Sequence, residues 1–97
     1  MRIISRNKII EYYTEHPDTE TALKDWYQKV KQAEWRCFAD MKQTFNSADS
    51  VGNQHYVFNI KGNNYRLIAV IKFTIKTVLN RLIRTHTEYD ARDAKNI

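Results

Sequence analysis

The spacing of apolar residues changes about half-way along the chain. From Arg6 to Phe45 they recur every three or four positions, as on one face of an α-helix. From His55 to Thr85 they tend to alternate with polar residues, as along a β-strand. Helices followed by neighbouring strands predict an α+β fold, in which N-terminal helices pack on one face of a small antiparallel sheet.

The first half of the chain predicts three helices. We expect Ser5 to cap the first helix and Pro17 to end it, because the residue before a proline avoids helical backbone angles. The expected helices cover residues 6–16, 19–32 and 35–45. Residues 46–53, which are rich in Asn, Ser, Asp and Gly, are expected to form a loop.

The second half predicts a meander of three strands. The expected strands cover residues 55–61, 65–73 and 77–85. Lys61–Asn64 would form the hairpin connection, and residues 74–76 a weaker turn. Residues 1–4 could add a short strand to this sheet, and the tail from Glu88 onward is expected to be a short helix or a frayed end.

Alternation sorts the strand residues onto two faces of the sheet. The face expected to meet the helices holds Tyr56, Phe58, Ile60, Tyr65, Leu67, Ala69, Ile71, Phe73, Leu79 and Ile83. The opposite face mixes polar with apolar residues: His55, Asn59, Lys61, Arg66, Lys72, Asn80, Arg84 and His86 with Val57, Ile68, Val70, Val78 and Leu82. Arg81 falls on the apolar face, which a bulge, an edge position or a register error would each explain.

The net positive charge of the chain lies entirely in the strand half. Residues 1–50 hold eight Lys and Arg against eight Asp and Glu, whereas residues 51–97 hold eight against three and so carry the whole net charge of +5. No acidic residue lies between Asp49 and Glu88. A one-sided positive field indicates a polyanionic partner, and phosphate is the leading candidate.

Length and composition favour a single cytoplasmic domain. Ninety-seven residues with 42% hydrophobic content suffice for one core, so we expect residues 1–97 to form one domain. The longest apolar run, residues 67–71, is far too short to span a bilayer, and no secretory leader is visible. Cys37 is the single cysteine, which fits a reducing compartment.

Metal-assisted catalysis is not expected from this sequence. Cys37 has no cysteine partner, and the three histidines lie too far apart for a zinc-ligand spacing. The basic half offers only a few carboxylates near its end, which argues against two-metal phosphoryl chemistry. No glycine-rich phosphate loop or nucleophile motif is present, so we expect neither a metal nor a cofactor.

A metal-free ribonuclease could be built from what remains. Such an enzyme uses the 2′-hydroxyl of RNA as its nucleophile and needs a proton acceptor, a proton donor and cations around the phosphate. Arg66, Arg84 and Lys61 are suitable cations, while His86 and Tyr89 could transfer protons. A histidine at a strand end is also an ordinary hydrogen-bonding surface residue, so the pattern alone leaves the choice open.

Two other classes of protein fit the same charge pattern. A non-catalytic RNA- or ribosome-binding module would use the basic face for salt-dependent contacts. A protein-binding domain would instead dock an acidic partner there. For RNA binding, the expected residues on this face are Arg84, Lys72, Asn59 and His55.

Two segments of the chain resemble the signature blocks of HigB-family toxins, which belong to the RelE-like superfamily of type II toxin–antitoxin systems. These segments are residues 56–68 (YVFNIKGNNYRLI) and 85–90 (THTEYD). Residues 1–5 and 35–52 also look like this family, so the likeness covers nearly the whole chain. One departure is Arg84, which stands where related sequences usually have glycine.

The resemblance implies a function, a fold and a partner. It implies an mRNA interferase, an endoribonuclease that cleaves mRNA on translating ribosomes and is neutralised by a HigA-type helix-turn-helix antitoxin. It also implies helices on one face of the sheet and RNA on the other, concave face.

The resemblance also implies roles for individual residues. Arg66 matches the sheet arginine that contacts the scissile phosphate, and Lys61 lies in the same hairpin block. His86 and Tyr89 lie in the segment that holds the acid–base groups, and which of them is the base stays open. The expected catalytic set is therefore Arg66, His86, Tyr89 and Lys61, in which Arg66 and Lys61 stabilise the phosphate charge. Arg84 would assist binding.

Overall fold

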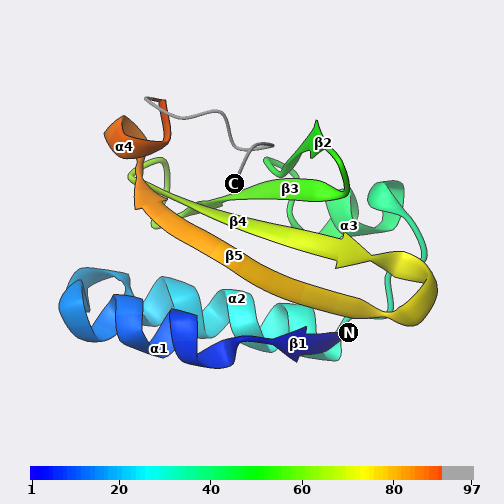
Figure 1. Ribbon diagram of the computed structural model, residues 1–97, viewed down its shortest axis with the longest axis horizontal. Helices are drawn as coiled ribbons and strands as arrows, with labels where there is room; N and C mark the ends of the chain where they lie inside the picture. The colour runs from blue at the N-terminus through cyan, green and yellow to red at the C-terminus, as the bar shows by residue number, and fades with distance from the viewer. Residues whose placement is uncertain (91–97) are drawn as a thin grey trace.

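The α+β class is confirmed, with a sheet that is mixed rather than purely antiparallel. The structure is a computed structural model that describes residues 1–90, apart from the side chain of Asp90. Its strands are β1 (Arg2–Ile4), β2 (Asp49–Gly52), β3 (His55–Ile60), β4 (Tyr65–Lys72) and β5 (Thr77–Thr85). They form one sheet in the order β1-β5-β4-β3-β2 (Figure 1). The strands β2 to β5 pair antiparallel, whereas β1 joins β5 in parallel.

The helices follow the predicted order. They are α1 (Arg6–Glu15), α2 (Glu20–Gln32), α3 (Phe38–Thr44) and α4 (His86–Asp90), with short 3₁₀ turns at Pro17–Thr19 and Phe73–Ile75. The first helix ends just before His16 and Pro17, as expected. Ser5 occupies the N-cap position, as expected, but it has φ 67° and its side chain makes no capping hydrogen bond.

The predicted loop over residues 46–53 contains an edge strand. Asp49–Gly52 pairs antiparallel with β3, with an irregular register between Ser50 and Gly52. Val51 is the only large apolar residue in this strand, so alternation gave no signal.

A β-bulge explains why Arg81 broke the expected alternation. Ile68 pairs with Leu82 while the next residue, Ala69, pairs with Asn80, so Arg81 is an extra residue in β5. The β5 side chains that precede Arg81 in sequence therefore lie on the sheet face opposite to the one that strict alternation predicts. Val78 and Asn80 are fully buried on the helix side, and Leu79 pairs with Val70 on the other side. The expected placements of these three β5 residues are wrong for this reason.

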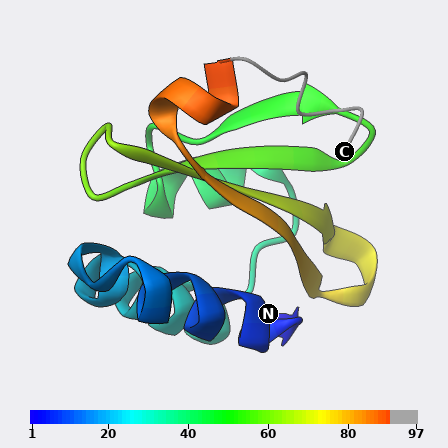
Figure 2. The same ribbon diagram turned by 60° about the vertical axis from the view of Figure 1, so that its left-hand side comes forward.

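The main core lies between the helices and one face of the sheet. Its buried side chains include Ile9 of α1, together with Leu23, Trp26 and Val30 of α2. From the strands it includes Phe58, Ile60, Leu67, Ala69, Ile71, Val78 and Ile83. The ribbon views show α1 and α2 side by side along the sheet (Figure 1, Figure 2).

A second, smaller apolar cluster lies on the opposite face. Val57 and Ile68 are buried there, and Val51, Leu82 and Tyr89 pack against them. This face therefore has a small apolar cluster of its own, and the polar residues of the candidate site lie beside that cluster. Within residues 1–90, no helix has both the length and the apolar character needed to cross a bilayer.

Candidate active site

Three predicted site residues form one row across the sheet. Arg66 of β4 pairs directly with Asn59 of β3 on one side and with Arg84 of β5 on the other. Directly paired residues in neighbouring strands project to the same face. Because the adjacent Leu67 is buried in the main core, this row lies on the opposite face.

A capping box fixes where β5 ends and α4 begins. The backbone N–H of Thr85 donates to Glu88 Oε1 at 2.9 Å, and the backbone N–H of Glu88 donates to Thr85 Oγ1 at 3.2 Å. These hydrogen bonds lower the pKa of the Glu88 carboxyl. His86 is thereby the first residue of the helix, and its backbone N–H donates to the Asn64 carbonyl at 2.8 Å.

The structure brings Arg66, His86 and Tyr89 together. Arg66 Nη2 lies 3.1 Å from His86 Nδ1. The Arg66 guanidinium carbon lies 5.9 Å from the centroid of the Tyr89 ring. A fixed cation, an imidazole and a phenol thus share one half-buried cluster, which has the groups that phosphodiester cleavage needs.

Asn63 in the β3–β4 hairpin binds two members of this cluster, and the sequence reasoning missed it. Its side-chain Oδ1 accepts from Arg66 Nη2 at 2.8 Å, and its carbonyl accepts from Arg66 Nη1 at 3.1 Å. The same carbonyl lies 3.0 Å from His86 Nδ1. An Asn in a hairpin three residues before the key arginine was the available signal.

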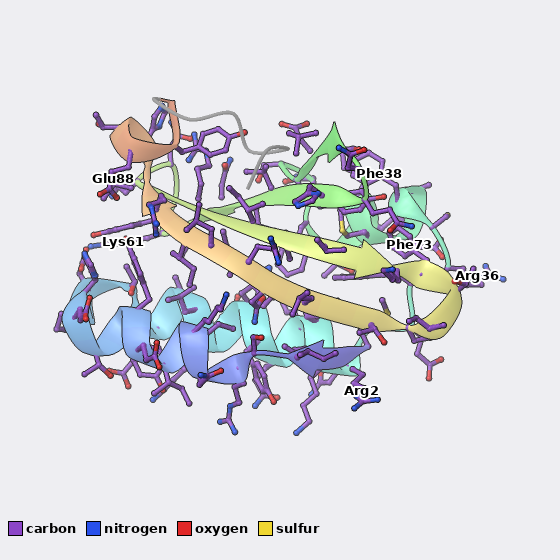
Figure 3. The ribbon with its side chains drawn as sticks, in the orientation of Figure 1. Arg2, Arg36, Phe38, Lys61, Phe73 and Glu88 are labelled. Atoms are coloured by element: carbon purple, nitrogen blue, oxygen red, sulfur yellow. The ribbon has the colours of Figure 1, made fainter. Side chains whose placement is uncertain are left out.

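Lys61 is engaged away from the row formed by Asn59, Arg66 and Arg84. Its Nζ donates to Asp18 Oδ2 at 3.0 Å, and the Tyr65 hydroxyl donates to the same oxygen at 2.9 Å. These two hydrogen bonds lower the pKa of the Asp18 carboxyl. Asp18 lies in the turn between α1 and α2, so Lys61 ties the hairpin to the helical layer (Figure 3). The reason is backbone geometry: Lys61 has φ 52°, which breaks the alternation that predicted its face.

Aromatic packing supports this corner of the fold. Tyr12 stacks on His16 with centroids 4.2 Å apart, and Tyr65 meets Tyr12 edge-on at 6.0 Å. Burial, and after it the neighbouring Glu88 carboxylate, raises the pKa of Tyr12 to about 12. Tyr12 therefore stays neutral at ordinary pH beside the charged residues of the site.

His55 and Lys72 lie at the far end of the same face. Along β4, Lys72 is six residues from Arg66, a separation of roughly 20 Å. His55 pairs with Val70, is only 9% exposed, and its Nδ1 lies 2.9 Å from the Asn53 carbonyl. The structure thus does not bring these two residues to the Arg66 cluster. Among the described residues, no three His, Cys, Asp or Glu side chains gather closely enough to hold a metal ion.

The family of the chain follows from a match to a family model. Residues 19–92 match the model of HigB toxins, described as the RelE-like toxic component of a toxin-antitoxin system. The chain belongs to this family. The family resemblance seen in the two sequence blocks is therefore confirmed, and a toxic component of this kind has an antitoxin as its partner.

Curated relatives agree along almost the whole chain. The chain is 33% identical over 92 residues to the mRNA interferase HigB of Escherichia coli O6:H1 (strain CFT073), which covers 93% of this chain and 89% of the relative. It is 27% identical over 92 residues to the mRNA interferase toxin HigB of Escherichia coli K12, covering 93% and 88%.

Proposed function

We propose that this chain is a toxin that acts as an mRNA interferase, cleaving mRNA on translating ribosomes without a metal ion. The observation that carries the proposal is the 3.1 Å contact between Arg66 and His86, with Tyr89 beside them on a basic face of the sheet. Membership of the HigB toxin family and likeness to proteins named mRNA interferase support the same reaction.

The proposed chemistry uses the RNA as its own nucleophile. The 2′-hydroxyl oxygen attacks the adjacent phosphorus, a protein base takes the hydroxyl proton, and a protein acid protonates the leaving 5′ oxygen. The new bond joins O2′ to phosphorus and the broken bond joins phosphorus to O5′, so the products are a 2′,3′-cyclic phosphate and a 5′-hydroxyl. His86 and Tyr89 share the proton transfers in this scheme.

Arg66 would stabilise the charge that grows on the phosphate oxygens, since a guanidinium forms paired hydrogen bonds with them. Arg84, which is paired with Arg66 across the sheet, would assist RNA binding. Lys61 is left out of this set, because its Nζ is occupied by Asp18.

Neutralisation by a HigA-type antitoxin is part of the proposal. The strand half of the chain carries the whole net charge of +5, so an inhibitor must cover or distort a cationic surface. We expect co-expression of a helix-turn-helix antitoxin encoded beside this toxin to restore growth.

Growth inhibition in the absence of antitoxin tests the assigned roles. We expect Arg66→Ala and His86→Gln each to abolish inhibition while the protein still accumulates in folded form. Lys24→Ala, which removes an exposed cation of α2 that pairs with Glu20, is the matched control and should remain strongly inhibitory. Full inhibition by both site variants would overturn these roles.

Chelation tests the metal-free scheme separately. Cleavage of ribosome-bound mRNA by the purified toxin should persist in EDTA, with the ribosomes kept intact by other means, because the proposed reaction needs only protein groups. Loss of cleavage on chelation, with recovery on adding a divalent cation, would contradict it. Binding without any cut would favour a non-catalytic RNA-binding module instead.

A further inference from the structure

Asn63 occupies a hairpin position from which its side chain and its carbonyl reach the candidate site together. The hairpin turns at Lys61 and Gly62, which have φ 52° and 66°, whereas Asn63 is not among the residues with positive φ. Asn63 is itself exposed. A substitution at Asn63 therefore removes side-chain contacts without imposing backbone strain.

The hydrogen bonds of Arg66 leave its guanidinium with a single orientation. Nη1 donates to the carbonyls of Asn63 and Tyr65 at 3.1 and 3.2 Å. Nη2 donates to Asn63 Oδ1 at 2.8 Å and contacts His86 Nδ1 at 3.1 Å. The two terminal nitrogens carry four N–H bonds, so all four contacts can be hydrogen bonds when His86 Nδ1 carries no proton. Asn63 supplies two of the four.

Asn63 also takes part in setting the proton on His86. Nδ1 donates to the Asn63 carbonyl when it carries a proton, and accepts from Arg66 when it does not. The two contacts select opposite tautomers, and the Asn63 carbonyl that meets the ring also accepts from Arg66 Nη1. The position of Asn63 is thus coupled to which ring nitrogen of His86 can take up a proton.

The hairpin that carries Asn63 is anchored at both sides. Lys61 binds Asp18 in the helical layer, and the Asn64 carbonyl accepts from the backbone N–H of His86. Asn63 is therefore held between the helices and α4, where a shift of the turn would move both Arg66 and His86.

We propose that Asn63 is a positioning residue, which holds the Arg66 guanidinium and the His86 ring in the geometry that RNA cleavage requires. The inference rests on the proposed function for its catalytic consequence. The holding of Arg66 itself can be measured without any reaction.

The first test is NMR of the Arg66 guanidinium at low temperature. We expect resolved Nη–H signals in the native chain, because four hydrogen bonds slow rotation about the Cζ–N bonds. In Asn63→Ala the Nη2 proton signals should merge into an average. In Asn64→Ala they should stay resolved, because Asn64 contacts Lys61 and His86 through its backbone. Asn63→Asp should restore them, since a carboxylate oxygen replaces Oδ1.

The second test is the rate at which the same four proteins cleave mRNA on translating ribosomes. Asn63→Ala should lower kcat about tenfold or more while KM changes little, because a misplaced catalytic group costs transition-state stabilisation. Asn63→Asp should recover kcat and raise KM, since its charge repels the phosphate. Asn64→Ala should behave as the native chain does.

The outcomes separate the two proposals. Resolved Arg66 signals in Asn63→Ala, or equal losses of kcat in Asn63→Ala and Asn64→Ala, would overturn the positioning role. If the native chain makes no cut at all, the proposed function fails, and the NMR comparison still decides whether Asn63 holds Arg66.

Discussion

Lys61 shows how one backbone angle redirects a side chain. Strand alternation put Lys61 on the basic face, but its positive φ turns it toward Asp18 instead. Its catalytic role stays a prediction, and the structure gives it a different task. It links the hairpin that carries Asn63 to the turn between α1 and α2.

Substitution of Lys61 and its partner should have the same moderate effect. Because Lys61 and Asp18 act as a pair, Lys61→Ala, Asp18→Asn and the double variant should lower RNA cleavage equally, and each far less than Arg66→Ala. Cleavage rates of the four variants check this. If Lys61→Ala lost as much cleavage activity as Arg66→Ala while Asp18→Asn cleaved at the native rate, Lys61 would instead act on the phosphate.

The pH dependence of this contact has a definite sign. The pKa of Asp18 is lowered by its hydrogen bonds from Lys61 and Tyr65. A lowered carboxyl pKa means that the contact stabilises the fold above the usual Asp range. That contribution is lost as pH falls through the lowered value.

Among the elements, α4 matters most for the site because it begins at His86 and carries Tyr89. Its start is set by the Thr85–Glu88 capping box. This box was readable in the sequence as Thr-x-x-Glu at residues 85–88, directly before the candidate acid–base residues. The same short segment therefore sets both the first residue of α4 and the positions of His86 and Tyr89.

Breaking the capping box should reduce activity through the position of α4. Thr85→Ala removes the side-chain acceptor for the Glu88 N–H, so we expect about a tenfold lower cleavage rate and weaker helical ¹³C shifts in α4. Thr85→Ser keeps a hydroxyl and should retain most activity. Thr87→Ala, exposed on the same helix, is the control. Native activity in Thr85→Ala would contradict this role.

Acid should have the same effect as breaking the box. The pKa of Glu88 is lowered by its hydrogen bonds with Thr85, so the capping interaction holds above the usual Glu range. It is lost as pH falls through the lowered value, since a protonated carboxyl is a weaker acceptor.

Most of the elements could be predicted from periodicity, and the misses have local causes. The strand Thr77–Thr85 and the end of α1 are where the pattern puts them. The strand Asp49–Gly52 was missed because a short edge strand buries few side chains, so its sequence shows no alternation of apolar and polar residues. The bulge at Arg81 inverted the faces of Val78, Leu79 and Asn80, because one inserted residue shifts every side chain beyond it.

The candidate site was predictable as far as single residues carry a signal. Arg66, His86 and Tyr89 were named from charge, residue type and family likeness, and the structure brings them together. Asn63 was missed although it lies only three residues before Arg66, and Asp18 was missed because its role depends on a contact across the fold. Asp18 and Lys61 lie 43 residues apart in sequence, and only the tertiary structure joins them.

Across the whole molecule, charge and packing are separated between the two faces of the sheet. The helices and the main core occupy one face, while the row of Asn59, Arg66 and Arg84 lies on the other. The apolar cluster of Val57 and Ile68 lies beside this row. The basic face thus combines cations with a small buried apolar cluster of its own.

Binding of a non-cleavable RNA should depend steeply on salt. If Arg66, Arg84 and Lys72 each contact one phosphate, the slope of log K against log salt for single-stranded RNA is about −2. Arg84→Ala or Lys72→Ala should each reduce its magnitude by about 0.7. Lys24→Ala, a cation of α2 that pairs with Glu20, should not change it. A slope that Arg84→Ala leaves unaltered would remove Arg84 from the RNA-binding surface.

The most direct test of the central claim is to map new 5′ ends on mRNA in a translation reaction supplied with the purified toxin. The native chain should create defined cuts bearing 5′-hydroxyl ends, and Arg66→Ala, folded and at equal concentration, should create none. Translation arrested without new ends, or the same cuts made by Arg66→Ala, would contradict the account.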